Sequence, residues 1–543
     1  MSEILVKSEQ GMNVKRVRGG AELVAAGIFL SRIAGLVRVR FFLSYFGGKS
    51  DAYEAFNAAL KVPNILQNLL GEGVLSASFI PVYARLVGEE KSIEAGRVAG
   101  VIATLLATVA SLLALIGVLL APYLIPFIAP GFIGEKRHFT ILFVQILFPG
   151  MALLVMSAWC LGVLNSHRRF FLSYAAPVVW NLTIISVLLL FGGQQSKYQL
   201  ATTVAWGLVL GSLLQFAVQV PTVLRLLPDL RLYIELSSKN VRAILSSFSS
   251  VVVGRGVVQI SGFIDNMLVT YLPTGAVTAL GNAQIIYMIP ISLFGMSVSA
   301  VSIAEMSLDQ ASGDELKSNN EEIRLRLNSG LKQVAFFIVP STAIFVFLGD
   351  ILGAALFQKG EYTASDVRYL WITLAGSGVG LLASALGRLY SSTFYAFQDT
   401  RTPLHFAFIR VVLTTILGYI GGIHVPGWLG ISSSWGTVGL TATAGFSGWV
   451  EFALLRRALN RKIGKTGIPR CFLAQLWIPA LIGVIGGWGV KLAAEHIRLG
   501  HPVIVAVFVF GVFGSIYLGG TLVAGVPQAQ TIWLSVRRRL RLH

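Results

Sequence analysis

One stretch of the chain carries polar side chains at helical spacing inside an otherwise apolar segment. The polar stripe of residues 54–72 consists of Glu54, Asn57, Lys61, Asn64, Asn68 and Glu72. At about 100° per residue these side chains fall within an arc of roughly 80° on one helical face. A charge at the centre of a bilayer costs about 2.5–3.5 kcal/mol, so in a membrane this face needs protein partners or a water-filled cavity. The stripe predicts a polar cavity, with a self-paired bundle core or a solvated helix face as the alternatives.

The apolar segment before the stripe contains three arginines, of which Arg40 can reach an interface by extending its side chain. Arg32 and Arg38 lie within residues 21–46, which are otherwise largely apolar. The planar guanidinium group binds two oxygen atoms at once, which suits phosphate. Arg32, Arg38 and Lys61 together would match an anionic phosphorylated lipid headgroup. The competing interpretation is that these cations form ion pairs with the two glutamates of the polar stripe.

A second set of charges lies in later apolar segments. Arg255 and Asp265 are ten residues apart, which places them within roughly 80° of each other on a helix. They either pair loosely, or Asp265 binds a coupling ion. Arg388, Arg410 and Glu451 are further charges inside apolar segments. Anchoring at a helix end or structural pairing explains them as well as a functional role does.

The composition is that of a polytopic membrane protein. Of the 543 residues, 55% are hydrophobic and 13% are charged, and apolar runs of about 20 residues recur along the chain. The net charge of +18 comes from basic residues at the ends of apolar runs, which follows the positive-inside rule and does not indicate nucleic acid as a partner. We find no phosphate loop, metal-ligand motif or nucleophile motif, so we expect neither an enzyme nor a cofactor.

The apolar runs predict an all-α fold with about fourteen transmembrane helices. The predicted helices are 21–46, 54–86, 97–128, 138–165, 172–193, 199–226, 241–270, 276–306, 327–356, 364–396, 404–424, 429–458, 473–496 and 501–526. Lys and Arg gather in the N-terminal tail, in several loops that should share one side, and in the C-terminal tail. Both termini are therefore expected in the cytoplasm, which requires an even number of spans.

A weak internal repeat predicts two six-helix halves. The segment 157–177 resembles 384–403 after a shift of 226–227 residues, and such repeats are common in transporters whose substrate binds between them. The predicted organisation is an N-terminal tail (1–20), a first bundle (21–226), a connector (227–240), a second bundle (241–458), an appended helix pair (459–526) and a basic cytoplasmic tail (527–543). The pairs Gly207/Gly211 and Gly483/Gly487 are predicted sites of close helix packing.

Several motifs resemble those of the MurJ (MviN) family of lipid II flippases, within the multidrug/oligosaccharidyl-lipid/polysaccharide exporter superfamily. They are SRIAGLVR from Ser31, EAFNAALKVPNILQNLLGEG from Glu54, SFIPVYARL at 78–86, APGF at 129–132, LFQKGEYTASD at 356–366 and FYAFQDTRTP at 394–403. The resemblance spans the whole chain and includes the two extra C-terminal helices.

The resemblance implies a bacterial inner-membrane flippase with fourteen helices around a cationic cavity. Its substrate would be the undecaprenyl-pyrophosphate-linked muropeptide called lipid II, moved from the cytoplasmic to the outer leaflet by alternating access for cell-wall synthesis. The residues implied in substrate binding are Ser31, Arg32, Arg38, Glu54, Lys61 and Glu72, to which the polar stripe adds Asn64. Helices 473–496 and 501–526 would form a groove for the lipid tail. Coupling to the membrane potential or to a monovalent cation is an expectation, and the sequence indicates no oligomeric state.

The chain departs from the family pattern at three positions. Val39 stands where the family commonly has an acid, and Gln67 and Gln284 stand where it has arginines. Either Arg255, Arg40 or another cation replaces the missing charge, or the substrate or mechanism has changed. An exporter of another lipid-linked oligosaccharide or of a drug, and a paralogue that does not transport, are the alternatives.

Overall fold

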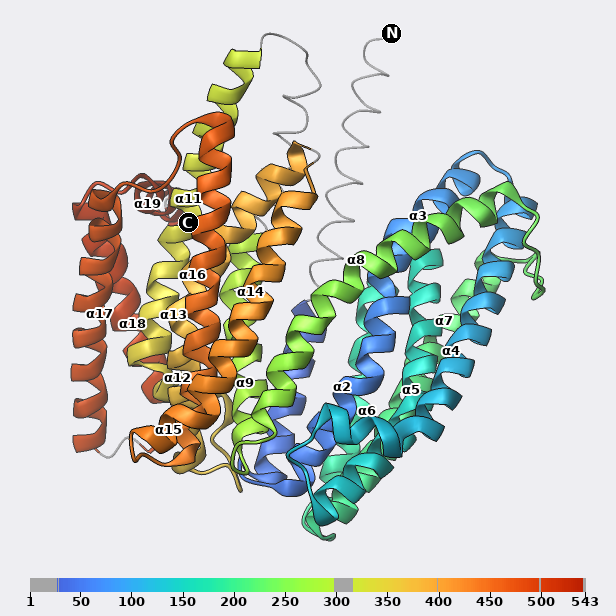
Figure 1. Cartoon of the computed structure of the whole chain (residues 1–543), viewed down its shortest axis with the longest axis horizontal. Helices are drawn as coiled ribbons and strands as arrows, with labels where there is room; N and C mark the ends of the chain where they lie inside the picture. The colour runs from blue at the N-terminus through green and yellow to red at the C-terminus, as the bar shows by residue number, and fades with distance from the viewer. Residues whose placement is uncertain (1–26, 28, 297–315, 398, 498–499, 541–543) are drawn as a thin grey trace. The chain divides into compact units, whose positions relative to one another are not determined.

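The computed structural model describes residues 27, 29–296, 316–397, 399–497 and 500–540. These residues form helices and connecting turns and contain no strand, so the predicted all-α fold is confirmed (Figure 1). The chain divides by its internal contacts into two units. Unit 1 comprises Met1–Met267 with Lys359–Glu361, and unit 2 comprises Leu268–Gln358 with Tyr362–His543.

Unit 1 is a bundle of long helices. After a helix over residues 29–46 come α2 (Asp51–Leu70), α3 (Glu72–Gly88), α4 (Ser92–Ile128), α5 (Gly134–Ser166), α6 (Phe170–Phe191), α7 (Lys197–Leu226) and most of α8 (Lys239–Val269). The start of α8 packs into the core of this unit, where Val241 and Ile244 are buried with Val98 and Ala99 of α4. This packing explains why the contacts divide the chain after Met267, whereas the predicted division lies at the connector 227–240.

Unit 2 contains the remaining helices. They are α9 (Ala276–Pro290) with η1 (Ile291–Met296), α11 (Leu316–Phe347), α12 (Gly349–Phe357), α13 (Ala364–Ala396), α14 (Arg401–Tyr419), η2 (Ile420–His424), α15 (Val425–Trp428), η3 (Ser433–Trp435), α16 (Gly436–Ile463), α17 (Arg470–His496), α18 (Pro502–Val523) and α19 (Pro527–Leu540). Helix α19 lies where a basic tail is predicted, and α16 begins later than the predicted residue 429.

Each of the fourteen predicted segments contains a helix over its described residues. Twelve helices in the described part of the chain are long and apolar enough to cross a membrane. The two predicted spans outside this set are the first, which begins in residues that are not described, and α8, where several side chains are not described. The chain is therefore a multi-pass membrane protein.

The predicted helix 54–86 is interrupted at one glycine. Gly71 has extended backbone angles (φ −88°, ψ −152°) between α2 and α3, and its N–H donates to the carbonyl of Gln67 at 2.8 Å. A Cβ atom at this position would lie 2.2 Å from that same carbonyl oxygen. The residue therefore permits a sharp break that places the end of α2 beside Glu72, the first residue of α3.

Two predicted small-residue pairs are confirmed as helix contacts. A Cβ at Gly207 or Gly211 of α7 would meet α6, at 2.8 Å from Val187 and 3.1 Å from Trp180 respectively. A Cβ at Gly483 of α17 would lie 3.0 Å from Phe513 of α18. The absence of side chains at these positions allows the helices to approach closely.

The end of α5 is fixed to α3 by a polar contact. The hydroxyl of Tyr83, which is fully buried, lies 2.9 Å from Nε2 of His167. Partial burial, reinforced by the nearby charge of Arg169, lowers the pKa of His167 below its ordinary value. The imidazole is therefore neutral at pH 7, and its Nε2 can accept the hydrogen bond from the tyrosine.

Candidate functional site: a polar cavity in unit 1

A cavity of about 710 Å³ lies within unit 1. Its wall comes from the helix 29–46 and from α2, α3, α5, α6 and α7. The polar and charged residues in this wall are Ser31, Arg38, Asn64, Gln67, Asn68, Glu72, Ser76, Ser157, Ser173, Trp180, Asn181 and Gln215. A cavity of this size can hold a drug-sized polar ligand or part of a larger one. The lining offers one guanidinium, one carboxylate and many uncharged donors and acceptors.

Only part of the polar stripe faces this cavity. Asn64 and Asn68 line it from the last two turns of α2, and Glu72 lines it from the start of α3. Gln67 lines it as well, so the position where the family has an arginine is an uncharged amide facing the cavity. These four side chains, on both sides of the break at Gly71, line the same cavity.

Arg38 brings the cationic group to the cavity. Its guanidinium carbon lies 4.5 Å from the ring centroid of Trp180, a cation–π contact that orients the side chain. Trp180 is in turn held by a hydrogen bond from its indole N–H to Ser212 Oγ at 3.2 Å. The Nε atom of Arg38 is buried and has no hydrogen-bond partner among the described residues. The arginine is therefore oriented by stacking and retains capacity to bind oxygen atoms.

A network of amides and hydroxyls forms a second part of the wall. Gln215 and Gln219 of α7 both donate to Ser157 Oγ of α5, at 2.9 Å and 2.6 Å. Asn181 of α6 donates to the carbonyl of Pro177 at 2.9 Å. Asn181 Oδ1 in the cavity wall remains a buried acceptor without a partner in the described part of the chain, and so does Gln219 Oε1 behind the wall. Such groups are unfavourable unless a ligand or water satisfies them, which fits a wall that recognises N–H or O–H donors.

The first turn of the stripe has a different environment. Glu54 is 1% exposed and accepts from Lys136 Nζ at 2.5 Å. The same ammonium lies 2.9 Å from Asp51 and 4.3 Å from the ring centroid of Phe132. Glu54 is thus held in an ion pair between α2 and α5 and is not part of the cavity wall, so its role as a substrate ligand stays a prediction.

The middle of the stripe contacts α8. Lys61 Nζ donates to Asn266 Oδ1, and the carboxylates of Asp265 and Glu54 lie close enough to interact with Lys61 electrostatically. Asp265 is half-buried, and ion binding by this residue stays a prediction. The side chain of Arg255, also on α8, lies outside the described residues.

The structure therefore separates the predicted site residues. Ser31, Arg38, Asn64 and Glu72 line one cavity, whereas Arg32 is exposed and is not among its lining residues. Four further residues of the cavity wall were not predicted from the sequence: Trp180, Asn181, Ser157 and Gln215. A polar residue in an apolar segment is a detectable signal. However, the four residues lie on three helices, α5, α6 and α7. Only tertiary packing brings them together, so the sequence does not show that they share one cavity.

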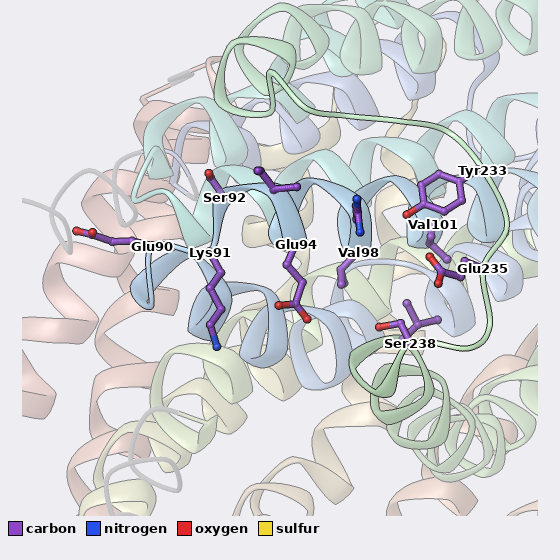
Figure 2. Close-up of a pocket in the computed structure, with 12 residues that line it drawn as sticks. Glu90, Lys91, Ser92, Glu94, Val98, Val101, Tyr233, Glu235 and Ser238 are labelled. Carbon is purple, nitrogen blue, oxygen red and sulfur yellow. The ribbon is translucent and has the colours of Figure 1, made fainter.

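A second hollow lies at the start of α4, beneath the connector. It has a volume of about 570 Å³, and Figure 2 shows Tyr233, Glu235 and Ser238 on its connector side with Glu90 and Lys91 on the other. Its lining mixes acids and bases without a buried cation. The larger cavity, with the guanidinium of Arg38 in its wall, is therefore the candidate functional site.

The connector that covers this hollow lies directly against the backbone of α4. A Cβ at Gly100 would lie 2.1 Å from the carbonyl oxygen of Arg231, and one at Gly96 would lie 3.3 Å from that of Asp229. At the end of the connector, Asn240 of α8 donates to Glu94 of α4 at 2.6 Å and accepts from Arg85 of α3 at 2.8 Å. The two glycines thus allow the connector to pack directly against the backbone of α4.

Comparison with known proteins identifies the family. A family model described as "Lipid II flippase MurJ" matches residues 43–513. The chain belongs to the MurJ family of lipid II flippases. The resemblance inferred from the helical motifs is thereby confirmed.

Individual MurJ relatives and one solved structure extend over nearly the same length. A "Probable lipid II flippase MurJ" of Rickettsia prowazekii is 26% identical over 508 residues, covering 90% of this chain and 95% of the relative. One of Rhizobium meliloti is 28% identical over 470 residues, covering 84% of each. A structure titled "Lipid II flippase MurJ, inward closed conformation" has a TM-score of 0.71 at 22% identity and covers 92% of this chain and 99% of that one. At that identity the structural match shows the fold.

Proposed function

We propose that the protein moves lipid II from the cytoplasmic to the outer leaflet of the bacterial inner membrane. The observation that carries the proposal is the cavity of about 710 Å³ with Arg38 in its wall, in a chain that belongs to the MurJ family. The headgroup of lipid II is a pyrophosphate joined to a disaccharide and a peptide. It therefore combines the oxyanions that a guanidinium binds with the hydroxyls and amides that the polar wall can satisfy.

In this proposal each part of the wall has a distinct role. Arg38, oriented by the ring of Trp180, binds the pyrophosphate. Asn181 and the network around Ser157 bind hydroxyl and amide groups of the sugars and peptide, and Glu72 binds a cationic group of the peptide. The polyprenyl tail stays in lipid while the headgroup crosses.

The proposed activity is transport by alternating access, in which the two six-helix halves change their accessibility without making or breaking a covalent bond. Both termini lie in the cytoplasm in the proposed topology. The membrane potential, or a monovalent cation bound near Asp265, provides the driving force, since one charge crossing 100 mV is worth about 2.3 kcal/mol.

The test is transport in liposomes that contain the purified protein. Lipid II placed in one leaflet is followed by its accessibility to a membrane-impermeant enzyme or reagent. The wild type should expose it on the other side, and Arg38→Gln should slow this by about tenfold or more, because hydrogen bonds to a charged group contribute about 1.5–3 kcal/mol. Arg457→Gln, which changes an exposed arginine, is the matched control.

A cellular assay completes the test. The gene should restore growth to bacteria depleted of their own flippase, and Arg38→Gln should not at equal protein level. Failure of the wild type in both the liposome and the growth assay would refute the proposed function. Transport of a different lipid-linked oligosaccharide in place of lipid II would refute its substrate.

A further inference from the structure

Four polar side chains from different helices of unit 2 lie close enough to interact electrostatically. Arg388 of α13 interacts electrostatically with Tyr287 of α9, Arg410 of α14 and Glu451 of α16. These helices are labelled in Figure 1. None of these residues belongs to the cavity of unit 1.

The charges lie well inside the span. Arg388 is eight residues before the end of α13 at Ala396, and Arg410 is nine residues after the start of α14 at Arg401. At 1.5 Å per residue these positions are about 12 Å and about 14 Å from the helix ends. The two ends are joined by only four residues, 397–400, so both arginines lie at similar depth from the same end of the bundle.

The positive charges outnumber the negative ones. Arg410 Nη1 pairs with Glu451 Oε2 at 3.0 Å, which satisfies that carboxylate. The guanidinium of Arg388 makes no hydrogen bond or ion pair at bonding distance within the described part of the chain. The group therefore carries a net charge of +1 at a depth where charge is unfavourable and usually functional.

Arg388 is also accessible. Its side chain is exposed, although the neighbouring Leu386, Leu389 and Tyr390 are buried. Gln284, one turn before Tyr287 on α9, is exposed as well and offers an uncharged donor. An exposed guanidinium that interacts electrostatically with Tyr287 and with a fixed arginine–glutamate pair is suited to an oxyanion with several oxygen atoms.

We propose that Arg388 is an oxyanion-binding residue of unit 2 and that it binds the phosphate groups of the transported headgroup. This inference rests on the proposed function and adds a second position for the pyrophosphate, separate from Arg38. The pair formed by Arg410 and Glu451 holds the second arginine in place and prevents Glu451 from neutralising Arg388.

The first experiment measures binding of lipid II to the purified protein in nanodiscs. Arg388→Gln should weaken binding by about tenfold or more, and Arg388→Lys should retain a substantial part of it because the charge remains. Arg457→Gln, an exposed arginine on α16, should bind like the wild type. Equal binding by the wild type and Arg388→Gln would overturn the inference.

The second experiment needs no variant and so does not depend on folding. Phenylglyoxal modifies accessible arginines, and mass spectrometry gives the rate at each one. Lipid II should slow modification at Arg388 and leave Arg457 unchanged. Inorganic pyrophosphate, added separately, distinguishes a free anion from a lipid-linked one, and protection by either supports the oxyanion site. No protection by either would overturn it.

The two proposals fail differently. If the wild type neither binds nor moves lipid II but pyrophosphate protects Arg388, the proposed function fails and the oxyanion site remains. If the wild type moves lipid II and Arg388 is neither protected nor needed for binding, the proposed function remains and this inference fails.

Discussion

Removal of the ammonium group of Lys136 tests how much the buried ion pair with Glu54, in the first turn of the polar stripe, contributes to stability. Lys136→Met keeps the aliphatic length of the side chain and deletes the charge that pairs with Glu54 and Asp51. Asp51 is 51% exposed and remains hydrated, so its loss of a partner is mild. Glu54 is 1% exposed and cannot regain water without local rearrangement.

The expected magnitude follows from this difference in burial. Removing one partner of a buried ion pair costs about 3–5 kcal/mol, and the 14% exposure of Lys136 places the effect near the lower end. A loss of about 3 kcal/mol corresponds to roughly a hundredfold change in the unfolding equilibrium. At about 2 °C per kcal/mol for a unit of this size, the melting temperature should fall by about 6 °C.

The assay is thermal unfolding of the purified protein in detergent, with two further variants. Adding Glu54→Gln to Lys136→Met removes the buried carboxylate that has lost its ion pair with Lys136 and should restore more than half of the lost stability. Lys91→Met breaks an ion pair with Glu89 whose partners are 55% and 44% exposed, so it should cost less than about 1 kcal/mol. A Lys136→Met variant as stable as the wild type, or a double variant no better than the single one, would refute the reasoning.

Two further predictions concern the connector and the end of α5. Gly100→Val should displace the connector, because the new Cβ would lie 2.1 Å from the Arg231 carbonyl oxygen. Trypsin should then cleave after Arg231 faster than in the wild type, whereas Gly96→Ala, with 3.3 Å available, should change the rate little; equal rates for Gly100→Val and the wild type would contradict the contact. His167 has a pKa lowered by burial, so the unfolded chain binds more protons below about pH 6.5. The melting temperature should therefore drop between pH 7.5 and 5.5, and His167→Gln should reduce that drop; an unchanged pH dependence in this variant would disprove the assignment.

The sequence was sufficient to predict the fold class and most helices, because a membrane span is set by the length and polarity of a local segment. The periodicity of residues 54–72 also predicted a polar face. It could not predict that Gly71 breaks the helix, because glycine permits both helical and extended angles. It also could not show that the polar stripe is divided among three environments. Its first turn forms an ion pair with Lys136, its middle contacts Asn266, and its end lines the cavity.

The residues around Arg38 show the same limit. An arginine in an apolar segment signals a functional group from sequence alone. Its orientation by Trp180 depends on a contact between residues 142 positions apart in the chain, and no local pattern encodes such a contact. The three charges Arg388, Arg410 and Glu451 were recognised individually, whereas the structure shows which two neutralise each other.

The spacing of Gly96 and Gly100 is that of the small-xxx-small pattern through which membrane helices often dimerise. Here that surface of α4 is already occupied, because the carbonyl groups of Asp229 and Arg231 rest on it. A helix from a second copy of the chain could reach these glycines only after the connector had been lifted away. The Gly96/Gly100 pattern is therefore used within the chain, to bind the connector, and is not free to bind a helix of a second copy.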